Sequence, residues 1–97
     1  MNSIIFHPEA ENEFREAVGW YAIQQKGLDI EFIRCIDEAV QKIERNPELY
    51  PIEFGHFRKK VVKRFPFIVF EILKNTIFIL AVFHSRRNPE VIKTRLQ

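Results

Sequence analysis

The chain has 97 residues, of which 46% are hydrophobic and 29% are charged. This balance is typical of one globular domain spanning residues 1–97, and it excludes a collagen-like, disordered or multidomain chain. The net charge of +2 is unevenly divided, because residues 1–56 hold five Lys/Arg and eleven Asp/Glu while residues 57–97 hold ten Lys/Arg and two Asp/Glu. The basic second half suits an anionic partner, either a phosphate backbone or an acidic protein segment.

Several features predict a soluble protein of the cytoplasm. The longest apolar runs, such as residues 76–83, are far shorter than the roughly 18 residues of a spanning helix, and the N-terminus lacks the layout of a signal peptide. The single Cys35 cannot form an intrachain disulfide. The spacing of His7, His56 and His84 matches no zinc-binding pattern. We therefore expect no membrane span, no metal and no cofactor.

The first half of the chain predicts a strand followed by two helices. Residues 3–6 are a short apolar run rich in β-branched side chains, and apolar residues then recur with helical spacing over about residues 9–25 and 28–45. Gly27 is placed to separate the two helices. Because this link is so short, we expect an antiparallel helix hairpin whose two apolar stripes face one core.

The second half predicts a sheet that covers these stripes. After a loop at 46–55, strand-like runs cover 57–65, 66–73 and 76–83. The last two runs are nearly continuously apolar and should be central, whereas the first is basic and suits an edge strand. Lys74-Asn75 has the length of a hairpin link, with Asn75 able to take a positive φ. We expect an α+β domain of order β-α-α-β-β-β, with the helix hairpin packed on an antiparallel sheet.

A run of cations on the basic strand is the first candidate binding group. It consists of Arg58, Lys59, Lys60, Lys63 and Arg64. The alternation of a strand places Arg58 and Lys60 on one face and Lys59 and Lys63 on the other. Two interpretations stay open, since such charges protect an edge strand from aggregation but also bind anions or a protein partner.

The second candidate group, His84-Ser85-Arg86-Arg87, follows the last strand. Each arginine can donate two parallel hydrogen bonds to phosphate or carboxylate oxygens, although exposed arginines often only pair with nearby acids such as Glu90. His84 has no neighbouring carboxylate or nucleophile in the sequence to define a catalytic dyad.

Four segments of the chain together resemble the toxins of the RelE/ParE superfamily, the toxic halves of type II toxin–antitoxin systems in bacteria and archaea. They are Phe6-His7-Pro8-Glu9-Ala10, Asn46-Pro47-Glu48-Leu49-Tyr50-Pro51, the segment from Arg64 to Phe70, and the segment from Leu80 to Pro89. Their order and spacing extend the resemblance over almost the whole chain. It implies a helix hairpin on an antiparallel sheet, and an antitoxin that lies along the hairpin and the sheet.

This superfamily contains two kinds of toxin. RelE-like members are ribosome-dependent endoribonucleases, whereas ParE-like members share the fold but inhibit DNA gyrase. RelE-like enzymes often carry an arginine where this chain has Phe67 or Ile68, and a late tyrosine where it has Ile92. Because both groups are missing, the resemblance favours a ParE-like toxin, a binding protein connected with plasmid stabilisation and growth inhibition. The expected target-binding or anion-binding residues are Arg58, Lys60, Lys63, Arg64, Arg86 and Arg87.

Two alternatives remain open at this point. One is a RelE-like endoribonuclease that cuts mRNA on the ribosome, with His84 as acid or base and with Arg86 and Arg87 stabilising the phosphate. The other is a non-toxic relative that only binds an antitoxin. The sequence also leaves the oligomeric state open between a homodimer and a toxin–antitoxin hetero-oligomer.

Overall fold

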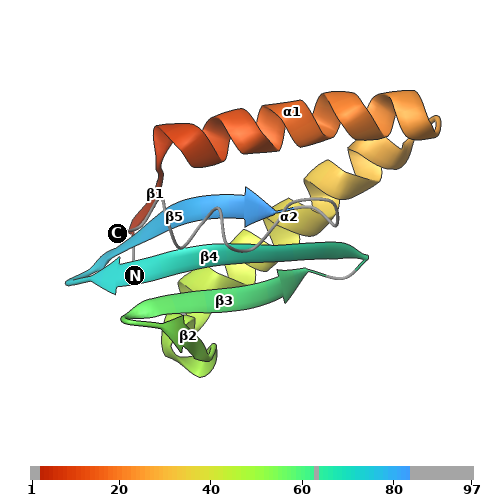
Figure 1. The fold of residues 1–97 in the computed structure, drawn as a ribbon. Coiled ribbons are helices and arrows are strands. Elements are labelled where there is room, and N and C mark those ends of the chain that lie inside the picture. Colours follow the sequence, from red (N-terminus) through yellow and green to blue (C-terminus); the bar gives the residue numbers. More distant parts are fainter. Residues whose placement is uncertain (1–2, 63, 84–97) are drawn as a thin grey trace.

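A computed structural model of the chain describes residues 3–62 and 64–83, and Figure 1 shows two helices packed on a five-stranded sheet. The elements in chain order are β1 (Ser3–Phe6), α1 (Pro8–Gln24), α2 (Leu28–Arg45), a 3-10 helix η1 (Pro47–Leu49), β2 (Ile52–Phe54), β3 (Phe57–Val62), β4 (Phe65–Leu73) and β5 (Thr76–Phe83). The predicted α+β class and helix hairpin are confirmed.

The helix boundaries follow from local chemistry. The Nδ1 atom of His7 accepts a hydrogen bond of 3.2 Å from the backbone N–H of Glu9, which caps α1, and Pro8 occupies the first turn, where its missing N–H costs nothing. Gly27 takes a positive φ of 86° between the helices. The predicted bounds of the first strand, the second helix and the last strand are all confirmed.

The sheet has the strand order β1-β5-β4-β3-β2, and it is mixed, whereas a wholly antiparallel sheet was expected. β1 runs parallel to β5, with Ser3 opposite Thr76 and Phe6 opposite Ile79, and the other neighbours are antiparallel. A parallel pair needs a long crossover, and the helix hairpin between β1 and the rest of the sheet contributes to that connection. The predicted central positions of the last two strands are confirmed.

Two turn regions differ from the sequence expectation. The predicted loop at 46–55 contains η1 and the short strand β2, so the basic strand β3 is not the edge of the sheet over its whole length. In the β4–β5 hairpin it is Lys74, with φ 57°, that takes the positive φ, and not Asn75. A two-residue hairpin turn accepts a positive φ at its first residue, as in the type II′ turn.

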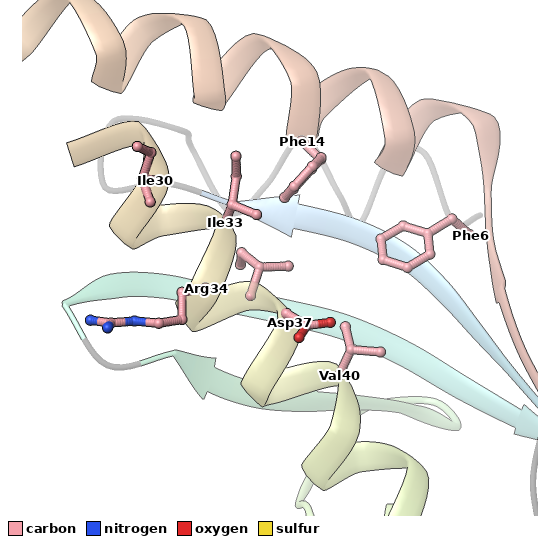
Figure 2. A pocket seen from close by; sticks show the side chains of 8 residues that line it. Phe6, Phe14, Ile30, Ile33, Arg34, Asp37 and Val40 are labelled. Carbon is pink, nitrogen blue, oxygen red and sulfur yellow. The ribbon is translucent and has the colours of Figure 1, made fainter. Parts of the chain in front are cut away.

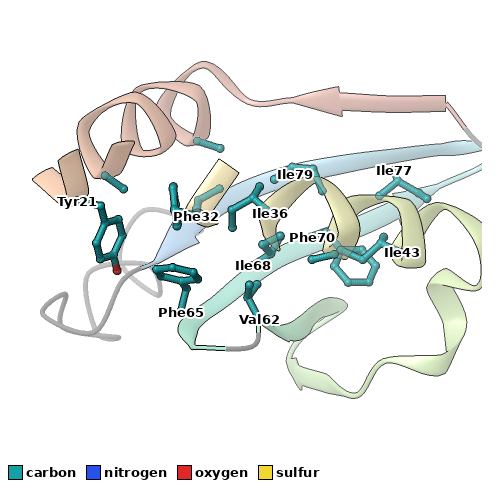
Figure 3. Packing of buried hydrophobic residues seen from close by; sticks show 14 residues of the cluster. Tyr21, Phe32, Ile36, Ile43, Val62, Phe65, Ile68, Phe70, Ile77 and Ile79 are labelled. Carbon is teal, nitrogen blue, oxygen red and sulfur yellow. The ribbon is translucent and has the colours of Figure 1, made fainter. Parts of the chain in front are cut away.

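The main core lies between the helices and the sheet, as Figure 3 shows. Three aromatic rings join the layers here: Tyr21 of α1, Phe32 of α2 and Phe65 of β4 lie with ring centroids 4.9–5.0 Å apart. The same burial raises the pKa of the Tyr21 phenol, because desolvation disfavours the charged form. Along the sheet the core continues through fully buried side chains at Ile68, Phe70, Ile77 and Ile79.

A smaller apolar cluster lies on the opposite face of the sheet. Val69, Ala81 and Phe83 are buried there, and the ring of Phe67 stacks on that of Phe83 at 5.0 Å. The ammonium group of Lys59 lies 4.6 Å from the centroid of the Phe67 ring. Both faces of β4 and β5 are therefore apolar, which is why these two strands are nearly continuous apolar runs in the sequence.

One buried carboxylate joins α1 to the sheet. β1 pairs with β5 only as far as Ile79, whose carbonyl accepts the N–H of His7 at 2.8 Å. Further along β5, the backbone N–H of Val82 donates to Oε1 of Glu13 at 3.1 Å, and Glu13 is only 7% exposed. Glu13 thus provides an acceptor for β5 where β1 has ended.

We expect Glu13→Ala to lower the free energy of unfolding by about 1–3 kcal/mol, because the buried N–H of Val82 loses its acceptor. Glu13→Gln should cost less, since the amide oxygen can still accept. Glu16→Ala, at an exposed position of the same helix, is the matched control. Urea unfolding of the three variants measures the difference; equal midpoints for Glu13→Ala and Glu16→Ala would contradict the role of Glu13.

Candidate functional site

The predicted cations of β3 divide between the two faces of the sheet, as their alternation suggested. Arg58 and Lys60 lie opposite Phe70 and Ile68 of β4, two residues of the main core, so both point to the helix side. Lys59 lies opposite Val69 on the other face, and its ammonium group is 3.8 Å from the carboxylate of Glu53.

Arg58 holds the loop that follows α2. Its Nη1 atom donates to the carbonyl oxygen of Tyr50 at 2.7 Å and to that of Glu48 at 3.2 Å. A guanidinium has several N–H groups and can donate to two carbonyl groups at once. The arginine therefore ties η1 and the residues after it to the sheet.

Arg64 occupies the turn between β3 and β4 with a positive φ of 70°. Its guanidinium pairs with the carboxylate of Glu31 on α2, and both side chains are partly exposed. This ion pair joins the basic turn to the acidic first turn of α2, where the charge of Glu31 also suits the helix dipole. Arg58 and Arg64 thus lie near opposite ends of β3 and contact different parts of the chain.

Lys60 lies between these two arginines and faces a second cation. Its ammonium group is 5.2 Å from the centroid of the Tyr50 ring. Partial burial lowers the pKa of Lys60, and the positive charge of Lys42 on α2 lowers it further. Among the ion pairs of residues 3–62 and 64–83, none joins Lys42 or Lys60 to a carboxylate.

The remaining predicted site residues lie outside the part of the chain that the structure describes. They are Lys63, His84, Arg86 and Arg87. The two other histidines have local roles: His7 caps α1, and Nε2 of His56 lies 2.7 Å from Oε2 of Glu71, which links the β2–β3 turn to β4. Among the described residues, no group of His, Cys, Asp or Glu is placed to hold a metal ion.

One apolar hollow was not predicted from the sequence. It lies between α1 and α2, has a volume of about 400 Å³, and Figure 2 shows its lining side chains. Phe6, Phe14, Ile33 and Val40 form apolar walls, and Ile30 is 69% exposed at its end near the helix link. A smaller hollow continues past Phe6 and Phe14 along α1. We call the two together the hairpin groove.

A sequence signal for this groove existed. Ile30, Ile33 and Val40 follow the spacing i, i+3, i+10, which is a second apolar stripe beside the core-facing stripe of α2. Arg34 and Asp37 lie between these positions and contribute charged groups to the lining of the groove. An exposed apolar patch with a charged border is typical of a protein interaction site.

A sequence model described as the ParE toxin of the type II toxin–antitoxin system parDE matches residues 4–89. The chain belongs to the ParE toxin family. As a member of this family, it is a type II toxin of the ParE kind.

The fold agrees with this assignment. A solved structure described as the chromosomal ParDE toxin–antitoxin system from P. aeruginosa aligns with a TM-score of 0.74 at 19% sequence identity, covering 87% of this chain and 96% of that one. No curated protein matches the chain. Within the described part of this ParE-family toxin, no helix is long and apolar enough to cross a membrane.

The pair formed by Lys42 and Lys60 makes a testable electrostatic prediction. Lys42→Gln should raise the pKa of Lys60, because it removes the neighbouring positive charge and leaves only the effect of burial. Because the pKa of Lys60 is lower in the folded state than in the unfolded state, the free energy of unfolding rises as the pH increases from the folded to the unfolded pKa. In the Lys42→Gln variant the two pKa values lie closer together, so this rise should be smaller. Titration of the Lys60 side chain by NMR measures the shift; Lys26→Gln, at the helix link, is the control and should leave it unchanged.

Proposed function

We propose that this chain inhibits DNA gyrase in the cytoplasm, stops replication and growth, and is neutralised by a cognate antitoxin. The family match over residues 4–89 is the observation that carries the proposal. Such a toxin acts by binding, and a plasmid or chromosome that encodes the pair is retained because cells that lose the antitoxin stop growing.

The packing of β4 supports a binding protein over a ribonuclease. Phe67 and Ile68 occupy the positions at which RelE-like enzymes often carry an arginine. Ile68 is fully buried in the main core, and Phe67 stacks on Phe83 at the other face. A guanidinium at position 68 would be buried without a polar partner, which is costly. At position 68 the fold therefore disfavours a cation that stabilises a phosphate.

The cations of the second half are the proposed contact residues for the target. We assign binding of the target to Lys60, Lys63, Arg86 and Arg87. Arg58 and Arg64 are also assigned to binding, in addition to the internal contacts described above. Loss of Arg86 and Arg87 together should weaken growth inhibition.

The hairpin groove is the proposed seat of an antitoxin helix. An amphipathic helix places apolar side chains at i, i+3, i+4 and i+7 into such a groove. The apolar walls around Phe14 and Ile33 suit these anchors, and Arg34 and Asp37 can pair with charges at the border of the helix. The antitoxin then covers both helices of the toxin.

The target is tested by inducing the chain in bacteria without its antitoxin and following DNA and protein synthesis in parallel. We expect DNA synthesis to fail first, and the purified chain to inhibit supercoiling by purified gyrase. Translation that stops first, with cut messages, would instead identify an endoribonuclease. No effect on either process would identify a non-toxic relative.

The groove is tested with Ile33→Glu. A carboxylate in the apolar wall must be desolvated when the antitoxin helix docks, so we expect the affinity for the antitoxin to fall roughly ten- to a hundredfold, which corresponds to about 1.4–2.8 kcal/mol. Growth inhibition by the free toxin should persist. Ile23→Glu is the matched control, because Ile23 is exposed and does not line the groove. Equal affinities of the two variants, measured by calorimetry, would place the antitoxin elsewhere.

A further inference from the structure

The outer edge of β3 is covered along only part of its length. β2 lies beside the first half of β3, as Figure 1 shows, with Ile52 opposite Arg58 and Phe54 opposite Phe57. The backbone N–H of Lys59 donates outward to the carbonyl of Pro51 at 3.1 Å. Before Pro51 the chain leaves the plane of the sheet as η1.

Val61 is the next residue whose backbone faces this edge. Polar backbone groups point to the same side at every second residue of a strand, and the register of β3 on β4 is regular from Arg58 to Val61. The N–H and C=O of Val61 therefore point outward, as those of Lys59 do. In the described part of the chain, no backbone hydrogen bond meets Val61 on that side. We call this position the open edge.

A hollow of about 300 Å³ lies between the open edge and α2. α2 contributes Cys35, Glu38, Ala39 and Lys42 to its lining, and β3 contributes Lys60 and Val61. The helix side chains nearest the core here, Cys35 and Ala39, are small, so a backbone can approach the sheet without displacing them. The hollow has the position that a sixth strand would occupy beside β3.

The charge of the hollow selects its occupant. Lys42 and Lys60 both line the hollow together with one carboxylate, Glu38, so its charged side chains carry a net positive charge. Among the described residues, no carboxylate forms an ion pair with either lysine. Burial and the charge of Lys42 both lower the pKa of Lys60. A carboxylate placed between these ammonium groups would relieve their repulsion and form charge-assisted hydrogen bonds.

At Val61 itself, the open edge carries neither of the usual protecting residues. Natural edges are commonly blocked by an exposed lysine or by a proline. Here the exposed residue at the edge is Val61, which is 63% exposed, while the ammonium group of Lys60 is held over the Tyr50 ring. An exposed β-branched residue with free backbone groups favours strand pairing.

We propose that an extended, acidic segment of a partner protein adds to the sheet as a strand beside Val61 and places a carboxylate between Lys42 and Lys60. Backbone hydrogen bonds supply affinity in this mode, and the lysine pair supplies the preference for an acidic sequence. Identifying the partner as the antitoxin rests on the proposed function. The strand site itself does not, because it follows from the edge of β3 alone.

The site is tested by NMR on the full ¹⁵N-labelled chain with a short capped peptide in which valine and glutamate alternate. We expect shift changes centred on Lys60–Val62 and on the facing turns of α2, and slower hydrogen exchange at the Val61 amide. The matched peptide with glutamine in place of glutamate should bind roughly tenfold more weakly, which is about 1.4 kcal/mol. Shift changes confined to other surfaces, or none, would overturn the proposal. So would a DNA oligonucleotide that competes for the same amides.

Two variants separate backbone pairing from charge. Val61→Pro removes the outward N–H at an edge position where proline is tolerated, and it should abolish binding of the glutamate peptide. The double variant Lys42→Gln with Lys60→Gln should remove the preference for glutamate over glutamine, whereas Lys26→Gln with Lys74→Gln, at two exposed lysines elsewhere, should preserve it. A double variant at Lys42 and Lys60 that keeps the full preference would overturn the role of the lysine pair.

Growth inhibition distinguishes this inference from the proposed function. A chain that stops DNA synthesis but leaves the open edge unperturbed by the peptide overturns only the strand site. A chain that binds the peptide at Val61 but inhibits nothing overturns only the assignment as a gyrase toxin.

Discussion

A contact of three aromatic rings holds both helices on β4. Tyr21, Phe32 and Phe65 come from α1, α2 and β4, and each ring touches the other two. Neither helix can cover its apolar stripe with the other helix alone, so both must rest on the sheet. Burial of each ring contributes about 2–3 kcal/mol, and the edge-to-face contacts add to this.

This anchoring determines where the helix hairpin remains open. The rings hold α1, α2 and the start of β4 together near the helix link, and Figure 1 shows α2 crossing the sheet away from α1. Phe14 still reaches Phe32 at 5.6 Å, but beyond it the helices separate and leave the hairpin groove. On its other side α2 leaves the hollow beside the open edge of β3. One helix therefore borders two surfaces, one apolar and one cationic.

The uneven charge of the sequence contributes to the packing of α2 on β3. The acidic first half and the basic second half meet where α2 faces β3, and there Glu31 pairs with Arg64. Arg58 donates hydrogen bonds to carbonyl groups of the segment that follows α2 and so holds this segment on the sheet. Lys42 and Lys60 differ from these arginines, because both line the hollow beside β3 and neither forms an ion pair with a carboxylate of the described residues. The basic surface thus combines groups that maintain the fold with groups that remain available to a partner.

Most of the helices and strands, the helix hairpin and the family resemblance follow from the sequence alone. Helical spacing and apolar runs depend on residues close in the chain, so the bounds of α2 and β5 were predicted correctly. The parallel pairing of β1 with β5 and the hydrogen bond that Val82 donates to Glu13 appear only in the folded chain, because each joins segments far apart in the sequence. The strand β2 pairs with its neighbour β3, but its three residues are too few to show a strand pattern. The groove at Ile33 and the open edge at Val61 also appear only in the folded chain. Both are spaces left between packed elements, and the distance between two elements is not encoded in the periodicity of either one.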